Sequence, residues 1–184
     1  IEAVIWMDVI QGFLLIAGGL VSVGILLFKP DTGAGVILSQ AFEWKKIDMG
    51  PYHFSLTELT FWVMVINGVF YALQKYGTDQ TIVQRYLTAR TDKDAKKAAY
   101  IGVLTSVPVW TLFMLIGSLL FVFYNSGQAS LPAGISADGV FPYFIKTELP
   151  VGAIGLVLAG LVAAAISSLD SDMNCIAAIG VQDF

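Results

Sequence analysis

The sequence predicts an all-α integral membrane protein, because its composition is unusually apolar and its apolar residues fall in four long segments. Hydrophobic residues make up 57% of the 184 residues and charged residues only 13%, whereas a soluble domain carries roughly 25% charged residues. The mean hydropathy is +0.76. A soluble chain of this composition has too few polar side chains to cover its surface, so a lipid bilayer is its expected environment.

Each of the four segments approaches the length of roughly 20 apolar residues that a helix needs to cross a membrane. The predicted spans are residues 3–28, 56–73, 98–124 and 151–171, and the last has an apolar continuation to Val181. We therefore expect four transmembrane helices, with all of residues 1–184 forming part of one membrane domain.

Polar residues near the ends of these segments predict where helices begin. Ser55 and Glu58 have the spacing of a capping box, which would start the second helix. Thr91 and Asp94 can cap a helical lead-in to the third, and Pro108 predicts a kink within it.

The distribution of basic residues predicts the orientation. Residues 85–97 carry five Lys or Arg, whereas residues 126–150 carry only Lys146. Cytoplasmic loops are enriched in Lys and Arg, so we expect loop 85–97 inside and loops 29–54 and 126–150 outside. The first and third segments then run outward and the second and fourth run inward. Loop 29–54 is expected to contain a short helix around residues 40–45.

Other features narrow the class of protein. The single Cys175 excludes an intrachain disulfide, and the single His53 excludes a histidine metal site within this chain. No basic stripe indicates a nucleic-acid partner. The chain shows no signal-peptide pattern and begins inside an apolar stretch without Met, so we expect it to work with the rest of a longer polypeptide.

Asp8 is a charged residue inside the first apolar segment. A charge near the bilayer centre costs about 2.5–3.5 kcal/mol on insertion scales, so such residues usually face the protein interior and serve a function. Asp8 could bind a cation or a proton there. It could equally lie at the interface, solvated or stabilising the helix N-terminus.

The fourth segment carries several hydroxyl groups in one pattern. Ala164, Ser167, Ser168 and Ser171 share one helical face, and Asp170 lies at its edge. Hard cations prefer oxygen ligands, and a backbone carbonyl one turn earlier adds another oxygen. The alternative is that these serines only join helices or bond back to their own helix.

The second segment ends in a polar run that starts at Gly77. A glycine here favours a helix break, and transporters place substrate sites at broken helices. The alternative is an ordinary helix end at the membrane interface, with Tyr76 as an interfacial aromatic residue.

Three passages, in this order and spacing, resemble the sodium/solute symporter family, which includes sodium/glucose, sodium/sialic acid and sodium/proline cotransporters. They are Trp6–Gln11, Gly77–Leu87 with its G-T-D-Q-T-I-V-Q-R run, and Ala164–Ser171. The resemblance covers nearly the whole chain. It implies a LeuT-like core of ten helices in two inverted five-helix repeats, of which this chain would supply helices five to eight.

The resemblance also implies the ligands of bound sodium ions. One ion would be held by the Ala164 carbonyl, Ser167 and Ser168, with its other ligands on a first helix outside this chain. A second ion would use Asp8, Ser167, Asp170 and Ser171, although Asp170 stands where some members have a serine.

Two departures from the family bear on the solute. Where sugar-transporting members have a gating tyrosine this chain has Lys75, with Tyr76 next and Tyr71 one turn earlier. Ser106 falls near the place of a galactose-contacting lysine. The candidate gate or substrate residues are therefore Tyr71, Lys75, Tyr76 and Gln80. The G-T-D-Q-T and S-S-L-D-S motifs look closer to those of bacterial symporters of sialic acid or other sugar acids.

We accordingly expect sodium-coupled symport of a small organic solute by alternating access, in a bacterial inner membrane and with no catalytic residues. Amino acids, vitamins and carboxylates are alternative solutes. A membrane enzyme in which Asp8 and Asp170 share a proton is a second class, but Gly77-Thr78-Asp79 lacks the G-x-G-D pattern of intramembrane aspartyl proteases. A sensor or channel on the same scaffold is a third.

Overall fold

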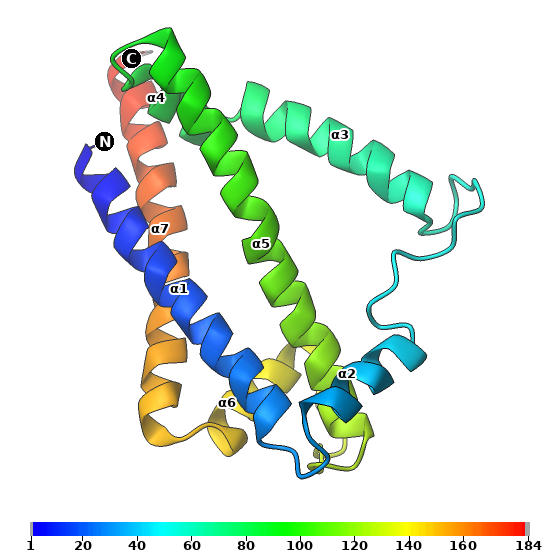
Figure 1. The fold of residues 1–184 in the computed structure, drawn as a ribbon. Helices are drawn as coiled ribbons and strands as arrows, with labels where there is room; N and C mark the ends of the chain where they lie inside the picture. The colour runs from blue at the N-terminus through cyan, green and yellow to red at the C-terminus, as the bar shows by residue number, and fades with distance from the viewer. Residues whose placement is uncertain (1, 183–184) are drawn as a thin grey trace. The chain divides into compact units, whose positions relative to one another are not determined.

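The computed structural model describes residues 2–182, and every regular element in that part of the chain is a helix, with no strand (Figure 1). Its elements are α1 (Glu2–Phe28), α2 (Ala34–Glu43), α3 (Phe61–Gly77), α4 (Gln80–Leu87), α5 (Asp92–Asn125), the 3-10 turn η1 (Ala137–Gly139), α6 (Val140–Glu148) and α7 (Val151–Gln182). The described residues form two compact units. One unit comprises residues 2–47 and 107–170, and the other comprises residues 48–106 and 171–182. The helices α5 and α7 each contribute residues to both.

Three of the described helices are long and apolar enough to cross a membrane. These stretches are Ile5–Phe28, Asp92–Asn125 and Val151–Val181. They correspond to the first, third and fourth predicted spans. The second predicted span, residues 56–73, is represented by α3, which has 17 residues and begins and ends later than predicted.

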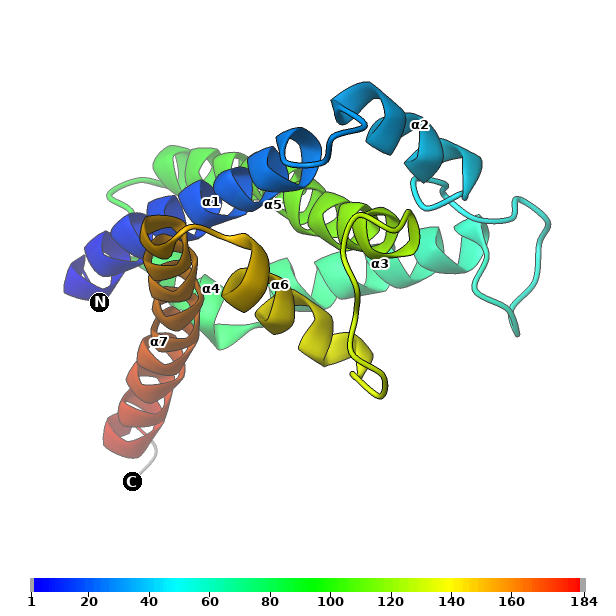
Figure 2. The same ribbon diagram turned by 90° about the horizontal axis from the view of Figure 1, so that it is seen from below.

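In the first unit, α1 lies against the first part of α7 (Figures 1 and 2). The two backbones come close together at Gly18 and Gly160. A methyl group added at Gly18 would lie 3.2 Å from the Val157 Cα, and one at Gly160 would lie 3.0 Å from the Leu14 carbonyl oxygen. Gly18 comes after Leu14 on α1, whereas its partner Val157 comes before Gly160 on α7, so the two helices are antiparallel. Glycine permits this close approach of backbones in a membrane, where packing drives helix association.

The two long loops of this unit contain helices that close one end of it. The helices α2 and α6 bury one face each against the ends of α1 and α5, around Leu26, Ile37, Phe123 and Phe144. The sequence predicted a short helix in residues 29–54, and α2 lies there, six residues earlier than expected. It did not predict α6 within residues 126–150. Lys29 and Glu148, at the ends of α1 and α6, form an ion pair of 2.8 Å.

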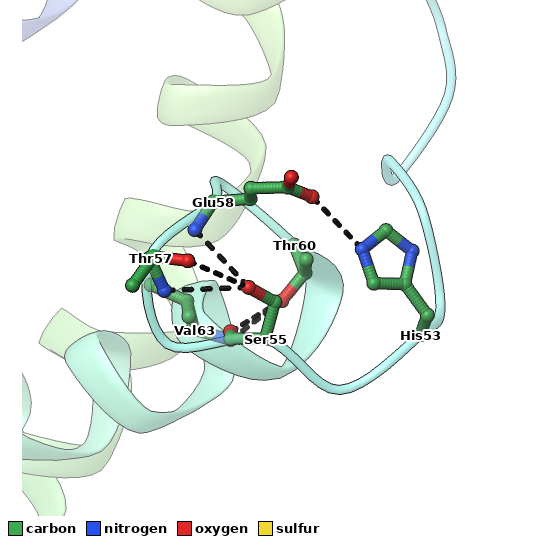
Figure 3. Close-up of polar contacts among 6 residues, drawn as sticks. All are labelled: His53, Ser55, Thr57, Glu58, Thr60 and Val63. Atoms are coloured by element: carbon green, nitrogen blue, oxygen red, sulfur yellow. Dashed lines mark hydrogen bonds and ion pairs between the residues drawn. The ribbon is translucent and has the colours of Figure 1, made fainter.

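In the second unit, the turn before α3 explains why this helix begins at Phe61 and not near Ser55 (Figure 3). The Ser55 hydroxyl accepts hydrogen bonds from the backbone N–H of Thr57 and Glu58, which folds a tight turn. The Glu58 carboxylate binds His53 at 2.9 Å and does not return to the Ser55 N–H. Thr60 caps the helix by accepting from the Val63 N–H. The predicted capping box is therefore wrong, because its glutamate has a different partner.

The break predicted at Gly77 is present. The helix α3 ends there, and Asp79 caps the new helix α4 by accepting from the Thr81 N–H. Loop 85–97 is shorter than predicted, because α4 continues to Leu87 and α5 already begins at Asp92. Thr91 caps α5 as expected, since its hydroxyl accepts from the Asp94 N–H at 3.2 Å.

Candidate cation site

The antiparallel contact of α1 and α7 brings Asp8 and Ser167 together. The Ser167 hydroxyl donates a hydrogen bond to the Asp8 carboxylate, and both side chains are half-buried. These residues are 159 positions apart in the sequence, so their meeting depends on the register of the two helices. Asp8 thus faces another helix of the protein.

Ser168 and Ala164 lie one turn apart on the same face of α7. Ser168 is exposed, and its hydroxyl donates to the Ala164 carbonyl over a long distance of 3.3 Å. A serine that bonds back to its own helix is common.

Asp170 and Ser171 are in different environments, although they are neighbours in the sequence. Asp170 is half-buried, and within residues 2–182 its carboxylate makes no hydrogen bond or ion pair. The Ser171 hydroxyl, which belongs to the second unit, accepts a hydrogen bond of 2.8 Å from the Arg85 guanidinium. Of the four residues predicted for a second sodium, the structure therefore brings Asp8 and Ser167 into contact and gives Ser171 a different partner.

These groups fit a small monovalent cation in their chemistry. A carboxylate, hydroxyls and a backbone carbonyl are the oxygen ligands that hard cations prefer. Among the residues that the structure describes, no group of three or more His, Cys, Asp and Glu gathers at one place, so a multiply charged ligand set of the kind that binds Zn²⁺ is not found there.

The candidate gate residues lie at the break between α3 and α4. The Lys75 ammonium donates to Asp79 at 2.6 Å, and the Thr81 hydroxyl donates to the same carboxylate at 2.5 Å. The hydrogen bonds from Lys75 and Thr81 lower the pKa of Asp79 from 3.8 to about 2. Tyr76 beside this pair is half-buried. Lys75 is thus an ion-pair partner of the helix cap.

Tyr71 and Gln80, the other two candidate gate residues, are exposed. Tyr71 lies one turn before Lys75 on α3, and Gln80 is the first residue of α4. Their roles as gate or substrate residues stay predictions.

Sequence reasoning missed two polar features. Gln84 accepts a hydrogen bond of 2.8 Å from Asn174, so that α4 is joined to the end of α7 by this contact and by the Arg85–Ser171 bond. This contact could have been predicted from two features of the sequence. Gln84 and Arg85 are adjacent polar residues, and Ser171 and Asn174 are polar residues three positions apart on α7. The other missed feature is Gln11, which is only 6% exposed on α1.

Comparison with known proteins gives a consistent result over the whole chain. The chain is 36% identical over 177 residues to the sodium/sialic acid symporter SiaT of Proteus mirabilis, covering 96% of this chain and 36% of that protein. It is 32% identical over 184 residues to the sodium/sialic acid symporter NanT of Aliivibrio fischeri, covering 100% of this chain and 36% of that protein. The chain thus spans about a third of the length of these relatives.

The fold agrees as well. A solved structure of a substrate-bound, outward-open Na⁺-coupled sialic acid symporter matches with a TM-score of 0.87 and 36% identity, covering 94% of this chain and 37% of the other. This agrees with the predicted piece of a LeuT-like transporter core. The family model described as the sodium:solute symporter family matches residues 1–184. The chain belongs to the sodium:solute symporter family, and with its three long apolar helices it is part of an integral membrane protein.

Proposed function

We propose that this chain is part of a symporter that uses the sodium gradient to take up sialic acid or a related sugar acid by alternating access. The observation that carries the proposal is the contact between Asp8 on α1 and Ser167 on α7. A carboxylate and a hydroxyl from antiparallel helices are suited to a cation, since the carboxylate balances its charge and the hydroxyl adds a neutral oxygen. The resemblance of the chain to sodium/sialic acid symporters supports the choice of solute.

Two groups of residues would hold sodium. The first comprises the Ala164 carbonyl, Ser167 and Ser168, with further ligands from other parts of the protein. The second comprises Asp8 and Ser167, with Asp170 and Ser171 as further candidates. Sodium would supply binding energy that differs between the transporter's conformations, which is the only way in which an ion can shift their populations.

Uptake by the full-length protein tests this proposal. We expect Ser168→Ala to abolish sodium-dependent uptake of radiolabelled sialic acid into proteoliposomes, because it removes one ligand of the first ion. Ser22→Ala is a matched control, since within the described part of the chain the Ser22 hydroxyl donates to the Gly18 carbonyl of its own helix and to no other group. Unchanged sodium dependence in Ser168→Ala would remove this residue from the site.

The same preparation narrows the solute and the class of function. Amino acids, vitamins and carboxylates are the alternative solutes, and a sodium-dependent thermal-shift screen would rank them against sialic acids and sugars. We infer a bacterial inner membrane as the location, on the sources of the two relatives. Saturable, sodium-dependent accumulation would argue against a channel or sensor, and cleavage of added peptides would revive the enzyme in which Asp8 and Asp170 share a proton.

A further inference from the structure

A narrow groove between α6 and α7, within the first unit, has no role in the proposal above. It has a volume of about 280 Å³. Five of its six lining residues have hydrocarbon side chains and the sixth is a lysine. They are Pro142, Ile145 and Lys146 of α6 and Ile154, Leu158 and Leu161 of α7. Each set of three has the spacing of neighbouring helical turns, so one continuous face of each helix lines the groove.

The position of the groove along α7 sets its depth in a membrane. The apolar stretch that can cross the bilayer begins at Val151. With a rise of 1.5 Å per residue, Leu158 lies about 10 Å and Leu161 about 15 Å along the helix from that residue, which is within the hydrocarbon core. Lys146 comes five residues before Val151, on α6, so it lies at the level of the lipid head groups. The groove therefore combines apolar walls at the depth of acyl chains with a cation at the depth of phosphates.

Lys146 is the charged group that the groove offers to a ligand. Its side chain is exposed, and its ammonium makes no hydrogen bond or ion pair with any residue between 2 and 182. The neighbouring carboxylate of Glu148 pairs with Lys29 instead. Lys146 is also the only basic residue in residues 126–150. A lysine at the membrane surface strengthens the binding of an anionic head group by about fivefold.

We propose that this groove binds one phospholipid with an anionic head group, whose phosphate contacts Lys146 and whose acyl chain lies along α7. An acyl chain is no more attracted to apolar walls than to the surrounding lipid, so the preference for this lipid comes from the charge of Lys146. The groove is too small for another helix, because one helical turn with its side chains is about 10–12 Å across and occupies at least roughly 400 Å³.

This inference goes beyond the proposed function and is independent of it. None of the six residues that line the groove is a candidate sodium, gate or substrate residue. Loss of lipid binding and loss of sodium dependence are therefore separate results, measured on different variants.

Native mass spectrometry of the purified full-length protein tests the lipid preference. Wild type should bind phosphatidylglycerol more tightly than phosphatidylcholine, which has the same acyl chains but no net charge. Lys146→Gln should weaken the binding of phosphatidylglycerol by about fivefold and leave that of phosphatidylcholine unchanged. Lys45→Gln is the matched control, since Lys45 is also exposed but does not line the groove. It should leave both affinities within about twofold of wild type.

A second pair of variants tests the apolar part of the groove and serves if Lys146→Gln does not fold. Leu158→Trp places an indole in the space of the acyl chain, so it should weaken the binding of phosphatidylglycerol at least as much as Lys146→Gln. Val162→Trp is its control, because Val162 is exposed on the same helix but does not line the groove. It should bind phosphatidylglycerol as wild type does.

Three results would overturn the proposal. Equal affinity of wild type for the two lipids would remove the role of charge. Displacement of phosphatidylglycerol by an equal concentration of inorganic phosphate would indicate a simple anion site. A melting temperature that falls in lipid-free detergent for Leu158→Trp but not for Val162→Trp would mean that another part of the polypeptide fills the groove.

Discussion

The two halves of α7 associate with other helices in opposite ways. In one unit, residues 151–170 meet α1 through glycines and alanines, so that backbones touch and one carboxylate–hydroxyl pair lies in the contact. In the other unit, the end of α7 meets α4 through polar side chains, with Ser171 and Asn174 bound to Arg85 and Gln84. The same helix thus combines close packing with hydrogen bonding, the two sources of helix association in a membrane.

The difference between the α1–α7 and α4–α7 contacts predicts which substitutions each contact tolerates. A backbone contact cannot accept added volume, because neither helix can move aside at a single residue. A contact between flexible polar side chains accepts changes in size but loses a partner when one group is removed. The first contact should therefore be sensitive to bulk and the second to the loss of individual hydrogen bonds.

The largest expected effect is at Gly160. A leucine there would place its Cβ 3.0 Å from the Leu14 carbonyl oxygen and 3.1 Å from the Leu15 Cα, so Gly160→Leu should destabilise the protein by about 3 kcal/mol. Gly155→Leu is the matched control on the same helix, since a Cβ at Gly155 meets no atom within 4 Å. Thermal unfolding of the two purified variants checks the comparison. Equal melting temperatures would show that the backbone contact does not limit side-chain size.

A smaller effect is expected at Asp79, which determines where α4 begins and hence which residues face α7. Asp79→Ala removes both the helix cap and the Lys75 ion pair, so it should cost about 1–2 kcal/mol at neutral pH. Asp79→Asn keeps a capping oxygen and should cost less than half as much. Unfolding temperatures at neutral pH measure both costs.

The pH dependence of this effect follows from the lowered pKa of Asp79. Its folded-state pKa is about 2 and its ordinary value is 3.8, so its stabilising contribution is complete above pH 4 and is lost as the pH falls toward 2. The difference in melting temperature between wild type and Asp79→Asn should shrink over that window. A difference that stays constant down to pH 2 would mean that the ion pair adds nothing to stability.

The smallest expected effect is the coupling between Gln84 and Asn174. Hydrogen bonds between membrane helices contribute about 0.6 kcal/mol on average. A double-mutant cycle with Gln84→Ala, Asn174→Ala and the double variant should therefore give a coupling of that size in unfolding experiments. A coupling near zero would indicate that the Gln84–Asn174 hydrogen bond adds nothing to the α4–α7 contact.

The sequence predicted the long helices well because their signal is length and apolar composition, which a membrane makes nearly decisive. The break at Gly77 and the cap at Thr91 were also predicted, since both depend on local chemistry. The start of α3 was predicted too early because His53 takes the Glu58 carboxylate, a partner that spacing does not reveal. Helix α6 was missed because its apolar residues pack against other elements and are too few to span a membrane.

The candidate site was accessible to sequence reasoning only in part. The shared helical face of Ala164, Ser167 and Ser168 follows from helix geometry, and Asp8 was conspicuous as a charge in an apolar segment. That Asp8 and Ser167 meet depends on the register of two helices that are far apart in the sequence. Gln11 ends one of the three passages that resemble the family, but its burial could not be predicted, because it depends on which elements pack around it. The roles of Asp8, Ala164, Ser167 and Ser168 as ligands stay predictions.

The glycine contact between α1 and α7 has a mechanical consequence. Asp8 lies six residues before Leu14, and Ser167 lies seven residues after Gly160, so the carboxylate–hydroxyl pair is about two helical turns from the point where the backbones touch. At this contact no flexible side chain lies between the two backbones that could rearrange to let them shift. We therefore expect the glycine contact to restrict relative movement of α1 and α7 near Asp8 and Ser167.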